Sequence, residues 1–310
     1  MHLLITGASG FIGRNLLQAV PAGWRVLATY HRSTDFVEFL QSKGLHHVQP
    51  LCIDLASDGA GARVAAVSSE FDGCIFLAAN GEPARSVDNP RLDLTANTIT
   101  LVEVLQQVRV RRFVYLSSGA VYDGLRGVVS PQSLLRPSLP YAISKLASEH
   151  YVQHFSRHGR IGTGVNVRFF GAFGPLEPER KIYTRLVRRF ALERDPRFSV
   201  SGDGQNFIDA MYVDDVVRAL LMIVQDPEGS ATSMTLDLSG GRPLTILALV
   251  RAAAEIFGLD PQITCSGSVP EYIEFRSGDR TMTERYRFSP RVSLAEGLAR
   301  LASHLGHRGT

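Results

Sequence analysis

The chain has 310 residues, 45% of them hydrophobic and 20% charged, which is typical of a folded α/β domain or two unequal lobes and excludes a disordered chain. Its formal charge is only +3 and its arginines are dispersed, which argues against a nucleic-acid or membrane partner. Met1 leads into a short apolar run without a signal-peptide pattern, and no run could span a bilayer, so we expect a cytoplasmic protein.

The first half of the chain alternates short apolar runs with longer helical patterns. The strand-like runs include HLLIT, RVLATY, CIFLAA and RFVYLSS. Continuous apolar strands separated by helices predict a parallel sheet that is covered on both faces. We therefore predict an α/β fold with a doubly wound, Rossmann-like sheet over residues 1–168. The Gly/Pro-rich segment GAFGPLEPE predicts a change to a smaller substrate-binding lobe over residues 169–310, with some segments returning to the first domain.

A glycine-rich turn joins the first strand to the first helix. In TGASGFIG, Gly7, Gly10 and Gly13 follow each other at three-residue spacing. Such glycines permit a tight turn and a close approach of the backbone to a pyrophosphate, which then lies at the positive end of the helix dipole. Because the turn lies between a strand and a helix at the start of an alternating chain, it predicts dinucleotide binding.

The end of the second strand bears on the choice of dinucleotide. NAD-selective folds carry an acidic residue there, whereas a basic residue accommodates the 2′-phosphate of NADP. The segment ATYHRS has no carboxylate, and His31 and Arg32 are its nearest polar groups. The pattern favours NADP, with NAD as the alternative in which Arg32 is only a loop residue.

The segment YAISK opens the longest helical pattern of the chain. Tyr141 and Lys145 are four residues apart and therefore lie on one helix face, although this spacing alone is common on surface helices. His150, His154 and His158 on the same helix have a spacing that could seat a metal. They lie about 180° away from the Tyr141 face, so we expect a solvated or subunit-facing stripe and no metal site.

Two later helices carry start signals. Asp214 or Asp215 is expected to cap the helix DDVVRALLMIV, and Ser293 with Glu296 forms a capping box before the last helix.

The segments TGASGFIG, FLAA, YLSSGAVY, YAISK and RFFGAFGP, in this order, resemble the extended short-chain dehydrogenase/reductases, the NAD(P)-dependent epimerase/dehydratase family. The resemblance implies that Ser118, Tyr141 and Lys145 are the catalytic residues. It also implies cofactor contacts from Gly7, Gly10, Phe11, Ile12, Gly13, His31, Arg32, Asp54, Leu55, Leu77, Ala78, Ala79, Asn97, Tyr141, Lys145 and Phe170.

The chemistry of the three residues fits this role. A lysine cation and a positive nicotinamide both favour the phenolate of Tyr141. Ser118 follows a sheet strand, where its hydroxyl can bind the reacting carbonyl or alcohol. Tyr141 then passes the proton while the cofactor passes the hydride.

The resemblance also narrows the reaction. Dehydratases of the family carry an Asp-Glu pair directly after the Ser/Thr of this segment, where the chain has Gly119 and Ala120. Neither residue can protonate a leaving hydroxyl, which disfavours a 4,6-dehydratase. A ketoreductase or dehydrogenase remains, with an epimerase as the alternative.

The expected substrate is a nucleotide-linked sugar. Two ligand-binding positions of the family are changed, an Asn to Gly171 and a diphosphate-binding Arg to Ile208. The segment RSGD nevertheless resembles the second phosphate-binding segment and makes Arg276 a substrate residue, with Ser118 at the reacting group. Lys181 and Arg185 are expected to add charge, or to form a solvated helix face.

Other functions stay open. GDGQNFIDAMYVDD also resembles the corresponding stretch of hydroxysteroid dehydrogenases, which allows a reductase of an uncharged sterol-like or polyphenol-like ligand. A non-catalytic nucleotide sensor is disfavoured by the intact Ser-Tyr-Lys set.

The helix LTANTITLVEVLQQV is apolar around more of its circumference than one sheet face requires. The resemblance implies that it pairs with the Tyr141 helix across a dimer axis, so we predict a homodimer.

Overall fold

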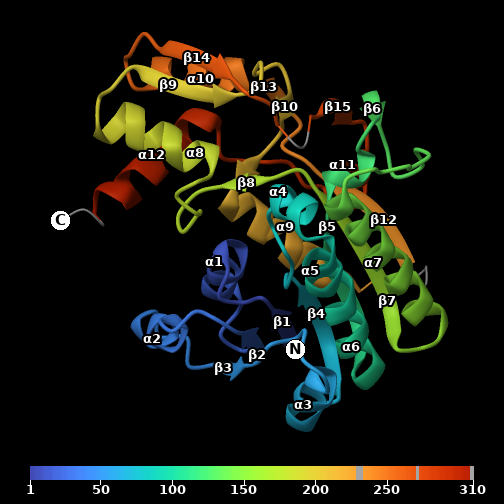
Figure 1. The fold of residues 1–310 in the computed structure, drawn as a ribbon. Coiled ribbons are helices and arrows are strands. Elements are labelled where there is room, and N and C mark those ends of the chain that lie inside the picture. Colours follow the sequence, from blue (N-terminus) through green and yellow to red (C-terminus); the bar gives the residue numbers. More distant parts are fainter. Residues whose placement is uncertain (228–232, 270–271, 308–310) are drawn as a thin grey trace.

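A computed structural model describes residues 1–227, 233–269 and 272–307 (Figure 1). Seven parallel strands form one sheet in the order β12-β7-β5-β4-β1-β2-β3, which confirms the predicted doubly wound α/β fold. The strand order reverses beside β1, where a crevice opens at the carboxyl ends of the strands. The strands are β1 (His2–Thr6), β2 (Arg25–Tyr30), β3 (Val48–Cys52), β4 (Glu70–Phe76), β5 (Arg109–Ser118), β7 (Ile161–Phe169) and β12 (Ser233–Leu238).

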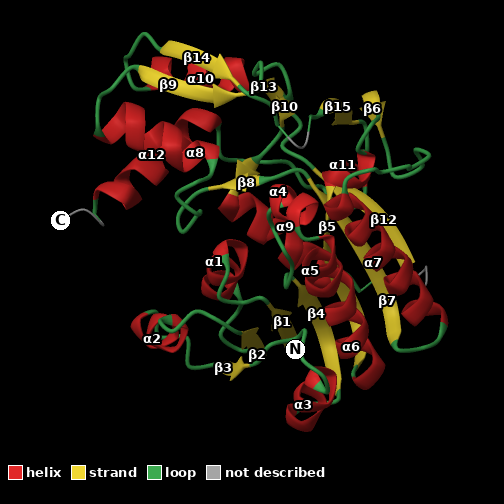
Figure 2. Cartoon of the chain, viewed as in Figure 1, coloured by secondary structure: helices red, strands yellow, loops and turns green. Residues whose placement is uncertain are grey.

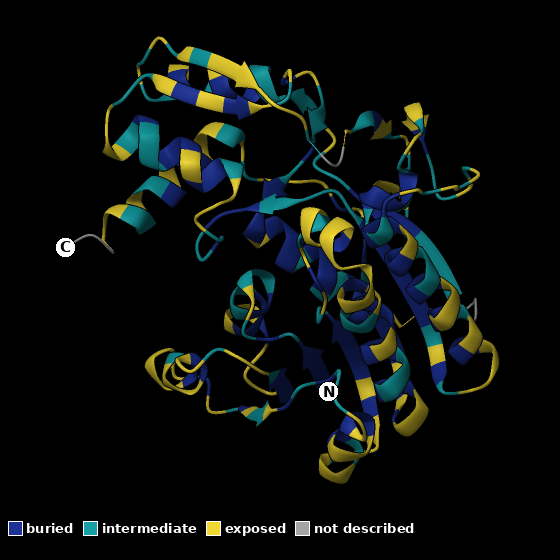
Figure 3. Ribbon diagram, viewed as in Figure 1, coloured by how far each residue is buried: buried dark blue, intermediate teal, exposed yellow. Residues whose placement is uncertain are grey.

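Helices cover both faces of this sheet, and the strands between them are buried (Figures 2 and 3). Side chains alternate along a strand, so Leu3 and Ile5 pack into one apolar layer and Leu4 into the other. The first layer includes α1 (Phe11–Ala19), α2 (Phe36–Ser42) and α9 (Val213–Gln225); the second includes α3 (Ala60–Val67), α6 (Thr100–Gln107) and α7 (Pro140–Arg157). Across the described ranges, no helix has the length and apolar character that crossing a membrane would require.

A smaller lobe lies beyond the carboxyl edge of the sheet (Figure 1). Helix α9 and strand β12 come from the second half of the chain but pack onto the sheet. The other elements are β8 (Ala172–Phe173), α8 (Ile182–Val187) with a π-helical turn (Arg188–Leu192), β9 (Arg197–Ser201), β10 (Phe207–Ile208), β11 (Met211–Tyr212), β13 (Leu244–Thr245), α10 (Ile246–Ile256), β14 (Gln262–Ser266), β15 (Glu274–Ser277), α11 (Thr281–Glu284) and α12 (Leu294–Gly306). Strand β15 pairs with β6 (Arg126–Val129).

Of the two predicted helix caps, one is confirmed. The Ser293 hydroxyl accepts a hydrogen bond from the Glu296 amide at 3.2 Å. The prediction for α9 is wrong, because this helix begins at Val213 and both aspartates lie inside its first turn. Asp215 instead accepts hydrogen bonds from the amides of Arg291 and Val292, which lead into α12.

The helix expected over residues 94–108 is divided. The chain forms α4 (Pro83–Asp88) and α5 (Pro90–Leu94), passes through a π-helical turn (Thr95–Ile99) and continues as α6. Such wide turns often occur at functional sites. Here the turn buries Asn97 and Thr98, and the Thr98 hydroxyl donates to the Ser144 carbonyl of α7 at 2.9 Å.

Candidate active site

A cavity of about 500 Å³ opens where β1, β4, β5 and β7 end and the smaller lobe faces them. Twelve predicted site residues line it, namely Gly7, Gly10, Phe11, Ile12, Gly13, Leu77, Ala79, Ser118, Tyr141, Lys145, Phe170 and Lys181. Residues at the carboxyl ends of the strands and from α1 and α7 therefore meet several segments of the smaller lobe.

The glycine turn forms the cofactor side of the cavity. Gly7 has a φ of 63°, and a β-carbon there would lie 2.8 Å from the Ala78 amide nitrogen. At Gly13 a β-carbon would lie 2.5 Å from the Ala8 carbonyl oxygen. The missing side chain at Gly7 lets the turn approach the segment after β4, and that at Gly13 lets α1 pack against the turn. The N-terminus of α1 is therefore open to a pyrophosphate.

The three expected catalytic residues converge on this cavity. Ser118 ends β5, and its Oγ accepts a hydrogen bond from the Ala120 amide at 3.1 Å. Tyr141 and Lys145 lie in the first two turns of α7, and Lys145 Nζ donates to the Leu116 carbonyl at 2.9 Å. That Nζ lies 5.9 Å from the Tyr141 ring centroid. Burial lowers the pKa of Lys145 to about 8, although nearby carboxylates oppose this shift.

A buried polar network supports the catalytic strand and helix. Glu149, one turn after Lys145, accepts hydrogen bonds from the Ser117 hydroxyl at 2.6 Å and from Arg168 at 2.8 Å. Arg168 also donates to the Tyr122 hydroxyl at 3.0 Å, and Tyr122 donates to Asp237 at 2.7 Å. The network fixes β5, α7, β7 and β12 relative to one another.

Several predicted cofactor residues lie beside the cavity without lining it. Ala78 contacts the Gly7 turn, and Asn97 is buried behind it, where its Oδ1 accepts from the Asn80 amide at 2.9 Å. At the ends of β2 and β3, His31 Nδ1 lies 3.8 Å from Asp54 Oδ1, Leu55 is buried and Arg32 is exposed.

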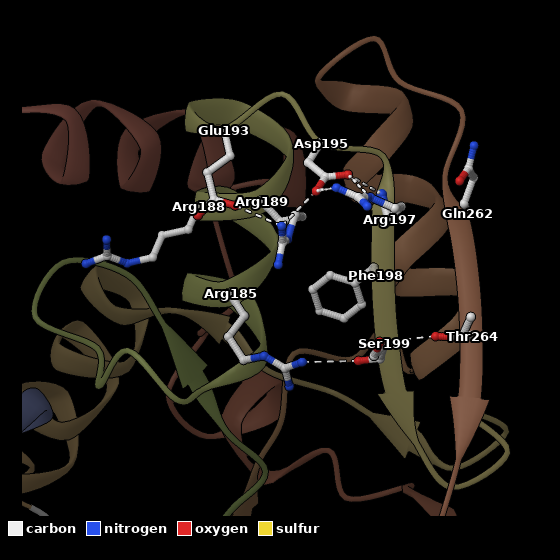
Figure 4. Close-up of a pocket in the computed structure, with 10 residues that line it drawn as sticks. All are labelled: Arg185, Arg188, Arg189, Glu193, Asp195, Arg197, Phe198, Ser199, Gln262 and Thr264. Carbon is white, nitrogen blue, oxygen red and sulfur yellow. Dashed lines mark hydrogen bonds and ion pairs between the residues drawn. The ribbon is translucent and has the colours of Figure 1, made fainter.

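Two expected substrate residues need correction, because the structure does not bring them to the cavity. Arg185 donates to the Ser199 carbonyl at 3.1 Å and packs over Phe198, within a separate arginine-rich pocket of about 710 Å³ (Figure 4). Arg276 is exposed, whereas its strand neighbour Phe275 is buried and lines the cavity. Successive strand residues point to opposite faces, so Arg276 points away.

The two changed positions, by contrast, do line the cavity. Ile208 contributes an apolar side chain, and Gly171 has a φ of 131°. A β-carbon at Gly171 would lie 3.1 Å from the Ala210 β-carbon, so the usual asparagine would be strained on this backbone. Of the three cations expected to bind substrate, Lys181 alone lines the cavity.

Sequence reasoning missed two acidic groups near the loop from the smaller lobe. Glu177 is buried and accepts hydrogen bonds from the Thr184 amide at 3.0 Å and hydroxyl at 2.7 Å. Burial raises the pKa of Glu177 to about 7. Glu82 pairs with Arg180, a cavity residue, at 2.7 Å. No local pattern marks either residue.

The histidine stripe is solvent-exposed on α7. The His154 and His158 rings lie 4.2 Å apart. Within the ranges that the structure describes, no group of three or more His, Cys, Asp or Glu side chains could hold a metal ion.

Known proteins resemble the chain in both sequence and fold. A family model described as the NAD dependent epimerase/dehydratase family matches residues 3–237. A dTDP-glucose 4,6-dehydratase of Streptomyces griseus is 31% identical over 96% of this chain and 92% of its own. A UDP-glucose 4-epimerase of Mycolicibacterium smegmatis is 27% identical over 97% of both chains.

Solved structures extend the likeness over the whole chain. MoeE5, solved with UDP-glucose and NAD, is 26% identical with a TM-score of 0.86 and covers 100% of both chains. A UDP-glucuronic acid 4-epimerase from Bacillus cereus, 24% identical over 99% of this chain and 100% of its own, shares the fold with a TM-score of 0.87. With the family model covering more than half of the residues, the chain belongs to the NAD-dependent epimerase/dehydratase family of enzymes.

Proposed function

We propose that this enzyme is a ketoreductase or dehydrogenase that acts on an alcohol or ketone carbon of a nucleotide-linked sugar. The observation that carries the proposal is the convergence of Ser118, Tyr141 and Lys145 on the cavity beside the glycine turn. A nicotinamide dinucleotide, when bound, supplies or accepts the hydride. An epimerase that uses the same redox step is the alternative.

The residues of this chain handle the proton. The Ser118 hydroxyl can hydrogen-bond the reacting oxygen, and the Tyr141 hydroxyl can give it or take from it a proton. Lys145 is buried and close to the Tyr141 ring. Its positive charge stabilises a tyrosine anion far more effectively there than in water.

Dehydration is not proposed, although a dehydratase is among the relatives. The position after Ser118 is Gly119, and a β-carbon there would lie 3.3 Å from the Phe170 ring. An acidic side chain at this position would therefore require a shift of Phe170, the residue that is expected to face the nicotinamide. Without a proton donor for a leaving hydroxyl, the reaction stops at oxidation, reduction or epimerisation.

We propose NAD as the working cofactor, in place of the NADP favoured above. The family description and the relatives solved with NAD support this choice. The structure supplies a physical reason, because Asp54 lies 3.8 Å from His31. A carboxylate thus lies beside the end of β2 although it comes from the turn after β3, and its charge disfavours a 2′-phosphate.

The nucleotide-sugar substrate is supported by the relatives and by Lys181. One observation favours the uncharged-ligand reductase as a second candidate, namely the apolar side chains that the smaller lobe presents to the cavity. These are Ile182, Phe207, Ile208, Ile246, Ile273 and Phe275.

Binding of UDP, GDP, CDP and TDP to the NAD-loaded enzyme separates the two candidates. We expect at least one nucleotide to bind and Lys181→Ala to weaken it about tenfold, as for a charge-assisted contact. Arg276→Ala, which changes an exposed side chain, is the matched control. Turnover of the corresponding sugars, followed by cofactor absorbance, separates net reduction from epimerisation. If the wild type binds none of the nucleotides, the uncharged ligand is the better proposal.

A further inference from the structure

A fully buried carboxylate, Asp93 at the end of α5, lies behind the active-site wall. Its Oδ1 accepts hydrogen bonds from the side-chain amides of Asn80 at 2.7 Å and Asn97 at 2.9 Å. Its Oδ2 is buried and has no hydrogen-bond partner among residues 1–227, 233–269 and 272–307. Burying a charge in this way is costly and calls for an explanation.

The hydrogen bonds of Asp93 connect the cofactor side of the cavity to the catalytic helix. Asn80 directly follows Ala79, a cavity residue, and its amide donates to Asn97 Oδ1 at 2.9 Å. The Asn97 carbonyl accepts from the Ser148 hydroxyl of α7 at 3.1 Å. Asp93 thus holds the loop after β4 and the π-helical turn against the part of α7 that carries Lys145.

Helix α5, which carries Asp93, packs against α7, which carries Lys145, and Asp93 lies close enough to act on the charge of this lysine. The titratable groups around Lys145 are Tyr115 of β5, Tyr141 and Glu149 of α7, and Asp93. Burial lowers the pKa of Lys145, and Asp93 opposes this shift more strongly than Glu149 does. Glu149, in addition, forms an ion pair with Arg168 at 2.8 Å.

We propose that Asp93 is a positioning residue of the active site, whose charge keeps the buried Lys145 protonated and whose hydrogen bonds fix the loop after β4. The proposal rests on the proposed function only for the role of Lys145. The proposal gives a role to a buried carboxylate whose Oδ2 has no hydrogen-bond partner among the described residues.

The test measures the ionisation of Lys145 directly. The chain contains only three lysines, Lys43, Lys145 and Lys181, so NMR of protein labelled in lysine side chains follows each one, assigned by single Lys→Arg substitutions. Asp93→Asn can retain both bonds at Oδ1 and place its amide at the unpaired Oδ2, so that mainly the charge changes. Asp88→Asn, at an exposed position of the preceding helix, is the control.

We expect Asp93→Asn to lower the titration midpoint of Lys145 by about one pH unit, with Lys43 and Lys181 unchanged. The pH profile of turnover should move in the same direction. An unchanged Lys145 midpoint in folded Asp93→Asn overturns the proposal. If that variant does not fold, Lys145 is titrated in Asp93→Ser, which also removes the charge, with NAD bound. An unchanged Lys145 midpoint in this variant, relative to the NAD-bound wild type, then overturns the proposal. If Lys145→Met keeps full turnover, the proposed catalytic role of Lys145 is wrong. The titration of Lys145 in the Asp93 variants still tests the role of Asp93.

Discussion

The guanidinium of Arg180 and the carboxylate of Glu82 lie 2.7 Å apart, although 98 residues separate them in the chain. Arg180 belongs to the loop before α8, and Glu82 lies between Gly81 and Pro83, which both line the same cavity. The ion pair therefore joins two sides of the active-site cleft. Both side chains are partly exposed, so the pair adds little to stability.

We predict that Glu82→Gln raises the dissociation rate of NADH about threefold to tenfold while changing the free energy of unfolding by less than about 1 kcal/mol. Stopped-flow displacement of NADH measures the rate. Glu284→Gln, which removes an exposed pair with Arg280 on α11, is the control. The charge-swapped double variant should restore slow release; equally fast release from it would argue against a bridging role.

Tyr141→Phe should remove most turnover while NAD still binds, because the ring is kept and only the transferable proton is lost. Lys145→Ala should weaken both turnover and NAD binding. Rates with the identified substrate and NAD dissociation constants are the measurements. Near wild-type turnover by Tyr141→Phe would show that Tyr141 is not the residue that transfers the proton.

The cofactor preference should depend on Asp54 more than on Arg32. Asp54→Asn is expected to improve NADP binding relative to NAD about fivefold, since a partly exposed charge contributes about 1 kcal/mol. Arg32→Ala should change this ratio little, because Arg32 is exposed at the end of β2. Fluorescence titrations with both dinucleotides measure the ratio. A selective loss of NADP affinity in Arg32→Ala would restore the NADP interpretation.

Asp237 should make the protein less stable as the pH rises. Burial raises the pKa of Asp237 to about 6, above the value of about 3.9 for an unfolded chain. The folded protein therefore holds this proton more tightly, and stability from this group falls between about pH 4 and pH 6. Asp237→Asn can still accept from the Tyr122 hydroxyl, and it avoids the buried charge.

Above pH 6 we expect Asp237→Asn to be more stable than the wild type by up to about 3 kcal/mol. Urea unfolding at pH 5 and pH 8 measures the difference, with the exposed Asp260→Asn as control. If the free energy of unfolding depends on pH in the same way in the wild type and in Asp237→Asn, the raised pKa of Asp237 is not the cause.

The homodimer stays a prediction, and the structure offers a surface for it. Exposed apolar side chains gather on α5, the following π-helical turn and α7, namely Leu92, Leu94, Ile99, Ile143 and Tyr151. Ile143→Asp should convert dimers to monomers in sedimentation experiments at micromolar concentration. Val128→Asp, at an exposed site on β6, is the control. A wild type that sediments only as a monomer would refute the prediction.

The parts of the site that sequence alone determined are those with a local rule. Gly7, Tyr141 and Lys145 follow strand-turn-helix and helix spacing, and Ser118 follows a strand. Parallel strands place their carboxyl ends at one sheet edge, so these residues meet whatever the details of packing.

Only the tertiary structure decided which other side chains join them. Asp54 reaches His31 because β2 and β3 are neighbours in the sheet. Asp93 lies near Lys145 because α5 and the π-helical turn pack on α7. Arg276 carries a motif match, yet the pairing of β15 with β6 turns it outward. Strand register and helix packing depend on the whole core, and a shift of one residue reverses the direction of a side chain.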